Sequence, residues 1–372
     1  MKNILVVFGG KSVEREISVL TGVLTANALD KTQYNAVPLY INENDEFFTG
    51  ESLLNLETYK NKDFVSALSS AVFLPNDNRL YIKKKNKLKP LKNISAVINC
   101  SHGALGEDGS LYGFFSYIGL ATVSSPIAPS SIAMDKSLTK TFLKGLGVKT
   151  VPSFTASYNE GRDEVIKNIE KLLSYPVIVK PATLGSSIGI SIAKNYQELF
   201  FSLNTAFKYC EKALVEKYIE NATEINCASY LMDDKIVVSE CEKPTSSSEV
   251  LTFSDKYILG NREFPAKIDK KISTKIKEIT KKVYKGLSAR GIIRIDFILD
   301  GKEIYLNEIN TVPGSLAYYL LTSSPEEFKD LLSKLVEFTL SEYAEKNSRV
   351  KTFDGGILSG GVFFGSKGAK SK

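Results

Sequence analysis

The segment RIDFILDGKEIYLNEIN, residues 294–310, combines charged and amide side chains with two apolar runs around an Asp-Gly pair. Such a pattern predicts a β-hairpin. With a three-residue loop, Arg294 lies opposite Glu308, and Arg294, Asp296, Glu308 and Asn310 all share one face. A two-residue Asp-Gly turn would place these pairs on opposite faces, because neighbouring side chains along a strand alternate between the two faces. The composition of this face therefore depends on the loop length.

Two carboxylates and an amide oxygen on one face are hard ligands that suit Mg²⁺. This ion usually keeps several waters and shares its shell with nucleotide phosphates. The alternative is a solvent-exposed sheet face with an Arg–Glu cross-strand pair. We favour the metal site at Asp296, Glu308 and Asn310. The turn TVPG that follows should expose the backbone N–H of Gly314 near the same face.

A glycine- and serine-rich loop, residues 183–189, lies between two apolar β runs and closely follows Lys180. Small residues let a backbone approach phosphate oxygens, and hydroxyl and N–H groups can donate to them. The loop is not a P-loop, since no GK[ST] precedes a helix, and no G-x-G-x-x-G follows a strand into a helix. By itself it indicates anion binding only weakly.

The only histidine of the chain, His102, lies in SHGALGEDGS, residues 101–110. Taken alone, this stretch is more typical of a polar turn than of a catalytic loop, because Gly, Ser and Asp favour turns. However, it follows the apolar run 96–100, which predicts a buried strand. Ligands of open α/β sheets collect at the carboxyl ends of strands, so the loop is also a candidate site.

Composition indicates a globular protein of two or three domains, with 372 residues of which 43% are hydrophobic. The net charge of +6 is mild, and we expect the lysine-rich segment 82–89 and the tail 365–372 to be solvated rather than to bind nucleic acid or a membrane. The four cysteines show no metal-binding or disulfide spacing. Without a signal peptide or a long apolar run, the chain is expected to be cytoplasmic.

The order of elements predicts an α/β protein that opens with a parallel-sheet domain. Residues 4–8 form a short apolar strand that a glycine turn joins to a helix. We expect residues 42–92 to be a surface elaboration of this domain. Residues 132–148 predict one helix that Gly147 closes, and residues 325–347 predict a final helix before a flexible tail.

Eight motifs in order resemble those of the D-alanine–D-alanine ligases of the ATP-grasp superfamily, and the match runs from about residue 9 to 340. They are GGKSVEREIS, HGALGEDGS, MDKSLTK, VKPATLGSSIGIS, VEKYI, DKY, RIDF and NEINTVPG. The resemblance implies a three-domain ATP-grasp architecture. It divides the chain into an N-terminal α/β domain at 1–125, a central subdomain at 126–220, a C-terminal subdomain at 221–350, and a flexible tail at 351–372.

The resemblance also implies an activity and a nucleotide site. ATP would phosphorylate the carboxylate of one D-alanine, and the amine of a second would attack the acylphosphate to give a dipeptide for peptidoglycan. Asp296, Glu308 and Asn310 match ligands of Mg²⁺, with two ions implied and Mn²⁺ as a substitute. The residues that match the ATP site are Lys136, Lys180 and Lys256 for the phosphates, Glu216, Lys217 and Ile219 for adenine, and Glu224 for the ribose.

The residues implied for the reacting groups come from several motifs. Arg294 and the N–H of Gly314 match the donors that stabilise the oxyanion of the tetrahedral intermediate. Glu14 matches the acid that holds the first substrate's ammonium, with Ser186 and Tyr257 as its hydrogen-bonded partners. His102 matches a histidine of the first-substrate pocket, where we expect it to orient the D-alanine carboxylate or steady the acylphosphate.

One departure concerns the second substrate. Where relatives commonly carry a serine for its carboxylate, this chain has SLAYYLL, with Tyr318 and Tyr319 at that place. Ser315 or a tyrosine hydroxyl could replace that serine. A ligase that uses D-lactate or D-serine second, another ATP-grasp carboxylate–amine ligase and a nucleotide-binding regulator are the alternatives, and the complete set of metal and lysine motifs disfavours the regulator. The resemblance further implies a homodimer.

Overall fold

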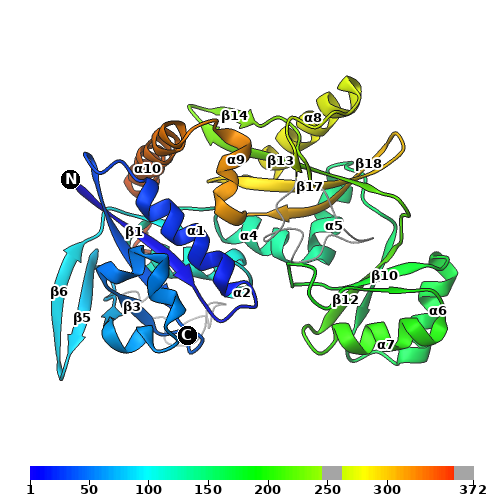
Figure 1. Cartoon of the computed structure of the whole chain (residues 1–372), viewed down its shortest axis with the longest axis horizontal. Coiled ribbons are helices and arrows are strands. Elements are labelled where there is room, and N and C mark those ends of the chain that lie inside the picture. The colour runs from blue at the N-terminus through cyan, green and yellow to red at the C-terminus, as the bar shows by residue number, and fades with distance from the viewer. Residues whose placement is uncertain (245–261, 356–372) are drawn as a thin grey trace, which may run out of the picture.

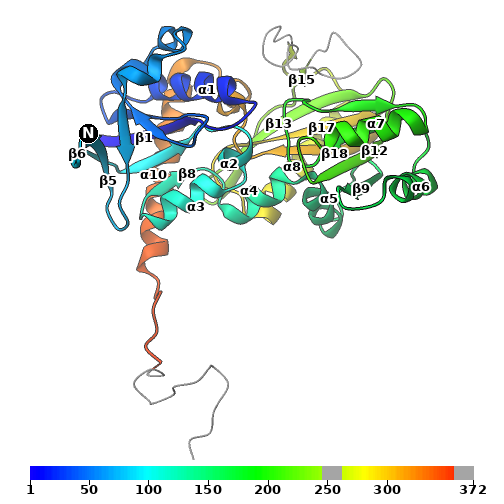
Figure 2. The same cartoon turned by 90° about the horizontal axis from the view of Figure 1, so that it is seen from below.

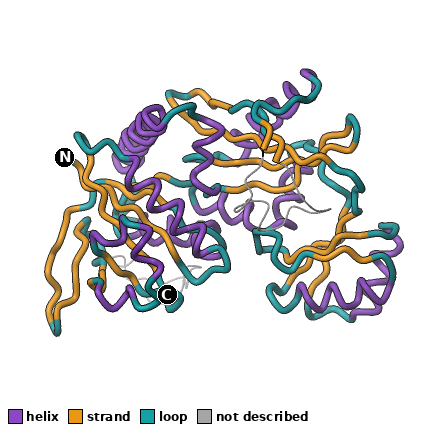
Figure 3. The backbone as a smooth tube through the Cα atoms, in the orientation of Figure 1, coloured by secondary structure: helices purple, strands orange, loops and turns teal. Residues whose placement is uncertain are grey.

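The computed structural model describes residues 1–244 and 262–355. These residues form three large β-sheets with helices packed on them, and one two-stranded ladder. Figure 1 shows the first sheet at the left, the third at the upper right and the second at the lower right. The tube of Figure 3 shows the strands of these sheets and the helices around them along one backbone. The strands of the first sheet are β1 (Lys2–Gly9), β2 (Tyr34–Ile41), β3 (Phe47–Thr49), β4 (Ser69–Val72), β5 (Arg79–Lys84), β6 (Lys87–Asn93), β7 (Ala96–Asn99) and β8 (Ala121–Val123).

The first sheet is mixed rather than purely parallel, and its order is β6-β5-β4-β3-β2-β1-β7-β8. The strands β2, β1, β7 and β8 are parallel, and Ile4–Phe8 of β1 are fully buried, as expected for strands covered on both faces. The segment expected as a surface elaboration adds the antiparallel strands β3 to β6. This segment also contains the 3₁₀ turns η1 (Glu51–Leu54), η2 (Leu56–Lys60) and η3 (Phe64–Ala67).

The helices of this first unit are α1 (Arg15–Ala28), α2 (Ala104–Glu107) and α3 (Ser110–Tyr117). The long helix α10 (Pro325–Ser348) returns to it from the end of the chain, which confirms the helix predicted at 325–347. Leu332 and Val336 of α10 are buried in one hydrophobic cluster with Ile4 and Val6 of β1. Figure 2 shows α10 beneath the first sheet. The two ends of the sequence thus share one core.

The second and third sheets are both antiparallel and have four strands each. The second has the order β11-β10-β12-β9, and the third has the order β14-β13-β17-β18. The strands are β9 (Ser153–Ser157), β10 (Val177–Pro181), β11 (Ser191–Ala193), β12 (Lys212–Lys217), β13 (Thr223–Met232), β14 (Lys235–Val238), β17 (Ile293–Asp300) and β18 (Glu303–Asn310). The helices around them are α4 (Ile127–Met134), α5 (Lys136–Gly145), α6 (Arg162–Leu172), α7 (Tyr196–Ala206) and α8 (Lys270–Leu287).

Each antiparallel sheet has its own hydrophobic core. Val165 of α6 and Leu199 of α7 pack with the second sheet, whereas Leu143 of α5 and Val283 of α8 pack with the third. A short ladder of β15 (Lys243–Pro244) and β16 (Arg262–Glu263) lies at the edges of the segment outside the described residues. The domain division at residues 125, 220 and 350 stays a prediction, and most of the tail predicted at 351–372 lies outside the described residues.

The single helix predicted at 132–148 is wrong, because the chain breaks at Asp135 into α4 and α5. The Asp135 side chain accepts hydrogen bonds from the N–H groups of Ser137 and Leu138, which is N-cap geometry. The apolar spacing continued across the break and concealed it. The cap starts α5 at Lys136 and so fixes where this lysine leaves the backbone.

Candidate active site

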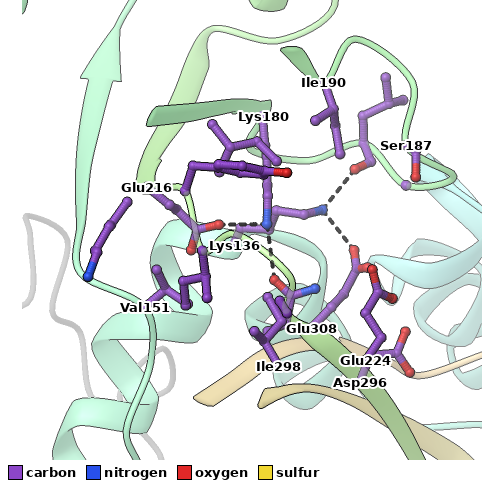
Figure 4. Close-up of a pocket in the computed structure, with 18 of the residues that line it drawn as sticks. Lys136, Val151, Lys180, Ser187, Ile190, Glu216, Glu224, Asp296, Ile298 and Glu308 are labelled. Carbon is purple, nitrogen blue, oxygen red and sulfur yellow. Dashed lines mark hydrogen bonds and ion pairs between the residues drawn. The ribbon is translucent and has the colours of Figure 1, made fainter. Parts of the chain in front are cut away.

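A cleft with an empty volume of about 900 Å³, partly open to solvent, is lined by residues of the second and third sheets and of α5. Figure 4 shows that several charged side chains point into it. Most of the residues predicted for nucleotide and metal are among its lining residues. Those are Lys136, Lys180, Glu216, Lys217, Ile219, Glu224, Asp296 and Glu308.

The hairpin β17–β18 brings the predicted metal ligands together by a different register from the one expected. Its turn has two residues, since β17 ends at Asp300 and β18 begins at Glu303. Arg294 pairs with Asn310, and Asp296 pairs with Glu308. The expected pairing of Arg294 with Glu308 is therefore wrong.

A two-residue turn would by itself place Glu308 on the face opposite Asp296, and a β-bulge explains why both side chains are on the same face. The register shifts between Asp296 and Phe297, and Asn307 is left without a partner in the ladder. One extra residue in β18 returns Glu308 and Asn310 to the face of Asp296. The bulged Asn307 also lines the cleft, and no sequence pattern predicted it as a site residue.

The carboxylates of this face already have cationic partners. Arg294 donates from Nε and Nη2 to the two oxygens of Asp296, at 2.7 and 2.8 Å, and Asn310 Nδ2 donates to Asp296 Oδ2 at 3.1 Å. Lys136 Nζ lies 2.8 Å from Glu308 Oε1. Within the described ranges no group of three or more His, Cys, Asp or Glu side chains has the geometry to hold a metal ion, so the candidate set is two carboxylates and one amide. Such a small oxygen set suits Mg²⁺, which takes few protein ligands.

Glu216, at the other end of the cleft, is held by two lysines. Lys140 Nζ lies 2.5 Å from Oε1, and Lys180 Nζ lies 2.6 Å from Oε2. Lys180 also donates to Asn307 Oδ1 at 3.0 Å. Burial opposes ionisation of Glu216, but the lysine charges outweigh it and lower the pKa of the carboxyl. We did not predict Lys140 as a site residue, although its position one turn after Lys136 on a helix was a usable signal.

A second pocket shares Lys136, Ser186 and Glu308 with the cleft, and Glu14, Glu107, Arg294, Asn310 and Thr311 complete its polar lining. The predicted pair is present, because Ser186 Oγ donates to Glu14 Oε1. Glycines allow this contact: a Cβ on Gly103 would meet Ser12 Oγ at 2.2 Å, and one on Gly185 would lie 3.0 Å from the Glu14 carboxylate. Two distant loops thus close on one carboxylate.

Glu107 is a half-buried acid of this pocket. It accepts a hydrogen bond from the Gly103 N–H at 2.8 Å and so shapes the loop. Burial, together with the charges of Glu14 and Glu308, raises the pKa of Glu107 to about 8. This raised pKa favours the protonated form of Glu107, which relieves repulsion among the three acids.

His102 is buried behind the second pocket rather than in its lining. Its Nε2 lies 2.9 Å from Thr21 Oγ1, which in turn accepts a hydrogen bond from the Ser315 N–H at 2.9 Å. Burial and the charge of Arg294 lower the pKa of His102 to about 3. The imidazole is thus neutral, and Thr21 of α1 joins it to the turn that follows β18.

That turn has an unusual backbone. Residues 315–317 all have φ near +50°, a left-handed conformation that is costly for residues other than glycine. These residues belong to the 3₁₀ turn η5 (Gly314–Ala317), whose first residue is the predicted oxyanion donor. The short helix α9 (Tyr318–Leu321) follows directly. This strain sits next to the candidate site, as strained backbone often does.

Tyr319 of α9 reaches the candidate site through its hydroxyl, which lies 3.4 Å from Arg294 Nη1. The guanidinium of Arg262 stacks on the Tyr319 ring, 4.6 Å from its centroid, and Arg262 Nη1 lies 3.2 Å from buried Glu242. Of the two groups that could replace the expected serine, the tyrosine hydroxyl is thus the one placed at Arg294. The predicted residues Lys256 and Tyr257 lie outside the described residues.

Comparisons with known proteins find relatives that match nearly the whole chain. Two family models match: "D-ala D-ala ligase N-terminus" at residues 3–125 and "D-ala D-ala ligase C-terminus" at residues 142–337. A D-alanine–D-alanine ligase from Thermosipho melanesiensis is 37% identical over 96% of this chain and 98% of its own length. The chain belongs to the D-alanine–D-alanine ligase family.

Solved structures of this ligase family have the same fold. The D-alanine–D-alanine ligase from Coxiella burnetii has a TM-score of 0.80 at 23% identity, and the match covers 93% of this chain and 96% of that chain. The VanG D-Ala:D-Ser ligase from Enterococcus faecalis has a TM-score of 0.76 at 28% identity, covering 91% and 99%. The expected ATP-grasp fold and the resemblance to D-alanine–D-alanine ligases are confirmed.

The described part of this ligase-family chain contains no helix with the length and apolar character needed to span a bilayer.

Proposed function

We propose that the protein joins two D-alanines at the expense of ATP, releasing ADP, phosphate and D-alanyl-D-alanine. The observation that carries this proposal is the convergence of Asp296, Glu308, Lys136 and Arg294, where the cleft meets the pocket of Glu14 and Ser186. Its support is the family membership and the name of the relative that is 37% identical. The two pockets share residues, so a nucleotide phosphate and a small amino acid can meet there.

In this proposal the long cleft binds ATP. Adenine lies at the end formed by Glu216, Lys217 and Ile219, and Glu224 accepts from the ribose hydroxyls. The phosphates lie toward the loop 183–189 with Lys136 and Lys180, and Lys256 approaches them from outside the described residues. The apolar walls, Val151, Ile178, Ile190 and Ile298, suit a flat base.

Asp296, Glu308 and Asn310 would hold Mg²⁺, one or two ions, with Mn²⁺ as a substitute. The metal would neutralise phosphate charge during phosphoryl transfer. Both carboxylates are already compensated by Arg294 and Lys136, so these cations must shift toward the substrate or share the carboxylates with the metal.

The second pocket binds the first D-alanine in this proposal. Glu14 accepts from its ammonium, supported by Ser186 and by Tyr257, and His102 orients the substrate carboxylate or steadies the acylphosphate through the loops it ties together. A carboxylate oxygen attacks the γ-phosphorus of ATP, and ADP leaves. The neutral amine of the second D-alanine then attacks the acyl carbon. The C–N bond forms, phosphate leaves with the C–O bond's electrons, and the nitrogen loses a proton.

Arg294 and the Gly314 N–H stabilise the oxyanion formed during that attack. Hydrogen-bond donors aimed at developing charge contribute most when the protein fixes them in advance. Asp296 and Tyr319 both contact the Arg294 guanidinium and so restrict its orientation.

A second candidate function uses D-serine or D-lactate as the second substrate. The observations that favour it are the tyrosine at the place of the expected serine and the match to the D-Ala:D-Ser ligase VanG. A mass-spectrometric screen of D-amino and D-hydroxy acids as second substrate separates the two functions. We expect D-alanine to give the largest product yield, and a larger yield with D-serine or D-lactate would favour the second function.

We also propose that the protein is a cytoplasmic homodimer that acts on small molecules and binds neither nucleic acid nor membranes. The support for the dimer is family membership alone. Light scattering coupled to gel filtration tests it, and a single peak at the mass of one chain, 41.0 kDa, would contradict it.

Phosphate release tests the main proposal. Release from ATP should require Mg²⁺ and D-alanine together, and the dipeptide should appear in equal amount. ATP turnover that ignores D-alanine, or no turnover when all components are present, would overturn the proposed ligase.

A further inference from the structure

The carboxylate of Glu216 has two cationic partners where one would neutralise it. Lys140 holds Oε1 and Lys180 holds Oε2, and the Glu216 side chain is only 3% exposed. A buried carboxylate needs a partner, because an unpaired charge in the interior is strongly destabilising. One lysine meets that need, so the other is free to serve a ligand.

The two lysines differ in their remaining contacts. Lys180 lines the cleft, and its second partner is the side chain of Asn307, which lines the cleft as well. Lys140 is not among the described residues that line the cleft, and its Nζ donates to the backbone oxygen of Val151 at 2.6 Å. Lys180 can therefore move toward a bound nucleotide, whereas Lys140 is fixed behind Glu216.

We infer that Lys140 is a positioning residue for adenine recognition, which keeps Glu216 ionised and oriented after Lys180 has moved to the nucleotide phosphates. Lys180 exchanges a carboxylate for a phosphate, so its charge is matched in both states. Its departure leaves Glu216 Oε2 open to accept a hydrogen bond from the exocyclic amino group of adenine. The inference rests on the proposed function, which places adenine at Glu216 and the phosphates at Lys180.

Without Lys140, both possible states of Glu216 weaken nucleotide binding. Glu216 either retains Lys180, which then does not reach the phosphates, or takes up a proton and accepts a weaker hydrogen bond. Hydrogen bonds to a charged group are stronger than those between neutral groups. Lys140 thus determines how strongly the cleft distinguishes a base with an amino group from one without it.

The test compares the binding of ATP with that of purine riboside 5′-triphosphate, which lacks the amino group but has the same ribose and phosphates. Calorimetry on the full chain with Mg²⁺ and without D-alanine gives both dissociation constants, and their ratio isolates the amino contact. The wild type should prefer ATP by about tenfold or more, the value of one charged hydrogen bond. In K140M and in K140Q, which keeps a donor for Val151, this preference should fall to about twofold.

Two further variants separate positioning from a structural defect. K140R keeps the charge and should retain most of the preference for ATP. K144Q changes an exposed lysine one turn along the same helix and should leave the ratio unchanged. Circular dichroism identifies which neutral variant is folded, and the ratio is measured on that one.

Loss of the ATP preference in a folded neutral variant supports the inference. A neutral variant with the wild-type ratio overturns it, as does a wild type that binds the two nucleotides equally well. The proposed function fails by a different result, the absence of D-alanine-dependent phosphate release by the wild type, and that assay does not depend on the nucleotide ratio.

Discussion

Asp296 and Glu308 lie directly opposite each other in the β17–β18 hairpin, and the bulge at Asn307 is the reason that they share a face with Arg294 and Asn310. A two-residue turn alone would have turned Glu308 away. The proposed metal site therefore depends on one residue that contributes no ligand. A single insertion or deletion in β18 is expected to be more damaging than a substitution there.

Deleting Asn307 should move Glu308 and Asn310 to the opposite face of the hairpin, because side chains alternate along a strand. We expect phosphate release to fall by about 100-fold or more, since the phosphates lose their electrostatic partner. The control is N307A, which keeps the residue count, loses only the contact with Lys180, and should retain most of the activity. Manganese binding followed by paramagnetic resonance reports the site, and a deletion variant that still binds the ion would contradict the bulge argument.

Replacing Arg294 with methionine should abolish ligation while ATP binding changes by no more than about threefold. Removal of a donor aimed at an oxyanion costs about 10²–10³ in rate. Dipeptide formation measured by mass spectrometry and nucleotide binding measured by calorimetry give the two quantities. Arg290, whose partner is Glu342 on α10, provides the control R290M. Ligation by R294M at the wild-type rate would remove the oxyanion role.

The Glu14–Ser186 contact should keep water away from the acylphosphate, because it joins the N-terminal loop to the serine loop. In S186A we expect more phosphate than dipeptide, whereas the wild type gives equal amounts. E14Q should show the same imbalance, and the double variant should be no worse than the more severe single one. Equal amounts of both products in S186A would show that this contact does not exclude water.

Y319F should selectively weaken the binding of the second substrate, because the Tyr319 hydroxyl lies near Arg294 in the place of the expected serine. Loss of one hydrogen bond to a carboxylate should raise the KM of the second D-alanine by about tenfold. The KM of ATP should be unchanged. Tyr318, whose ring packs 5.0 Å from that of Phe328, provides the control Y318F. A wild-type KM in Y319F would assign the carboxylate to another donor.

His102 should make the wild type less stable in mild acid. Its pKa is about 3 in the folded chain, below the ordinary value of 6.5, so the unfolded chain binds the extra proton first as the pH falls. Between pH 7 and pH 5 this protonation lowers the free energy of unfolding by about 2 kcal/mol. In H102Q that part of the pH dependence should vanish, which urea unfolding at both pH values measures. If the free energy of unfolding depended on pH equally in H102Q and in the wild type, the imidazole would be protonated in the folded state. The use of the first D-alanine should also be impaired in H102Q, and ATP binding much less.

The motifs predicted many of the candidate site residues, because each motif is a short local segment. The segments around His102, Lys136, Lys180 and Glu308 each place a few side chains at fixed spacing on one loop or strand, and their order along the chain identified the family. The break at Asp135 was equally local and was missed, because the apolar spacing on both sides continued across it. The N-cap residue was the signal that would have revealed it.

The amino-acid sequence by itself determined the residue types, the family and the likeness to an ATP-grasp fold. Only the tertiary structure decided which groups meet: Asp296 with Glu308, Lys140 with Glu216, and Tyr319 with Arg294. Alternation within a strand and capping of a helix act between near neighbours, so a sequence displays them. Bulges and contacts between elements arise from packing among segments far apart in the chain. The same charges in another register would have formed a different site.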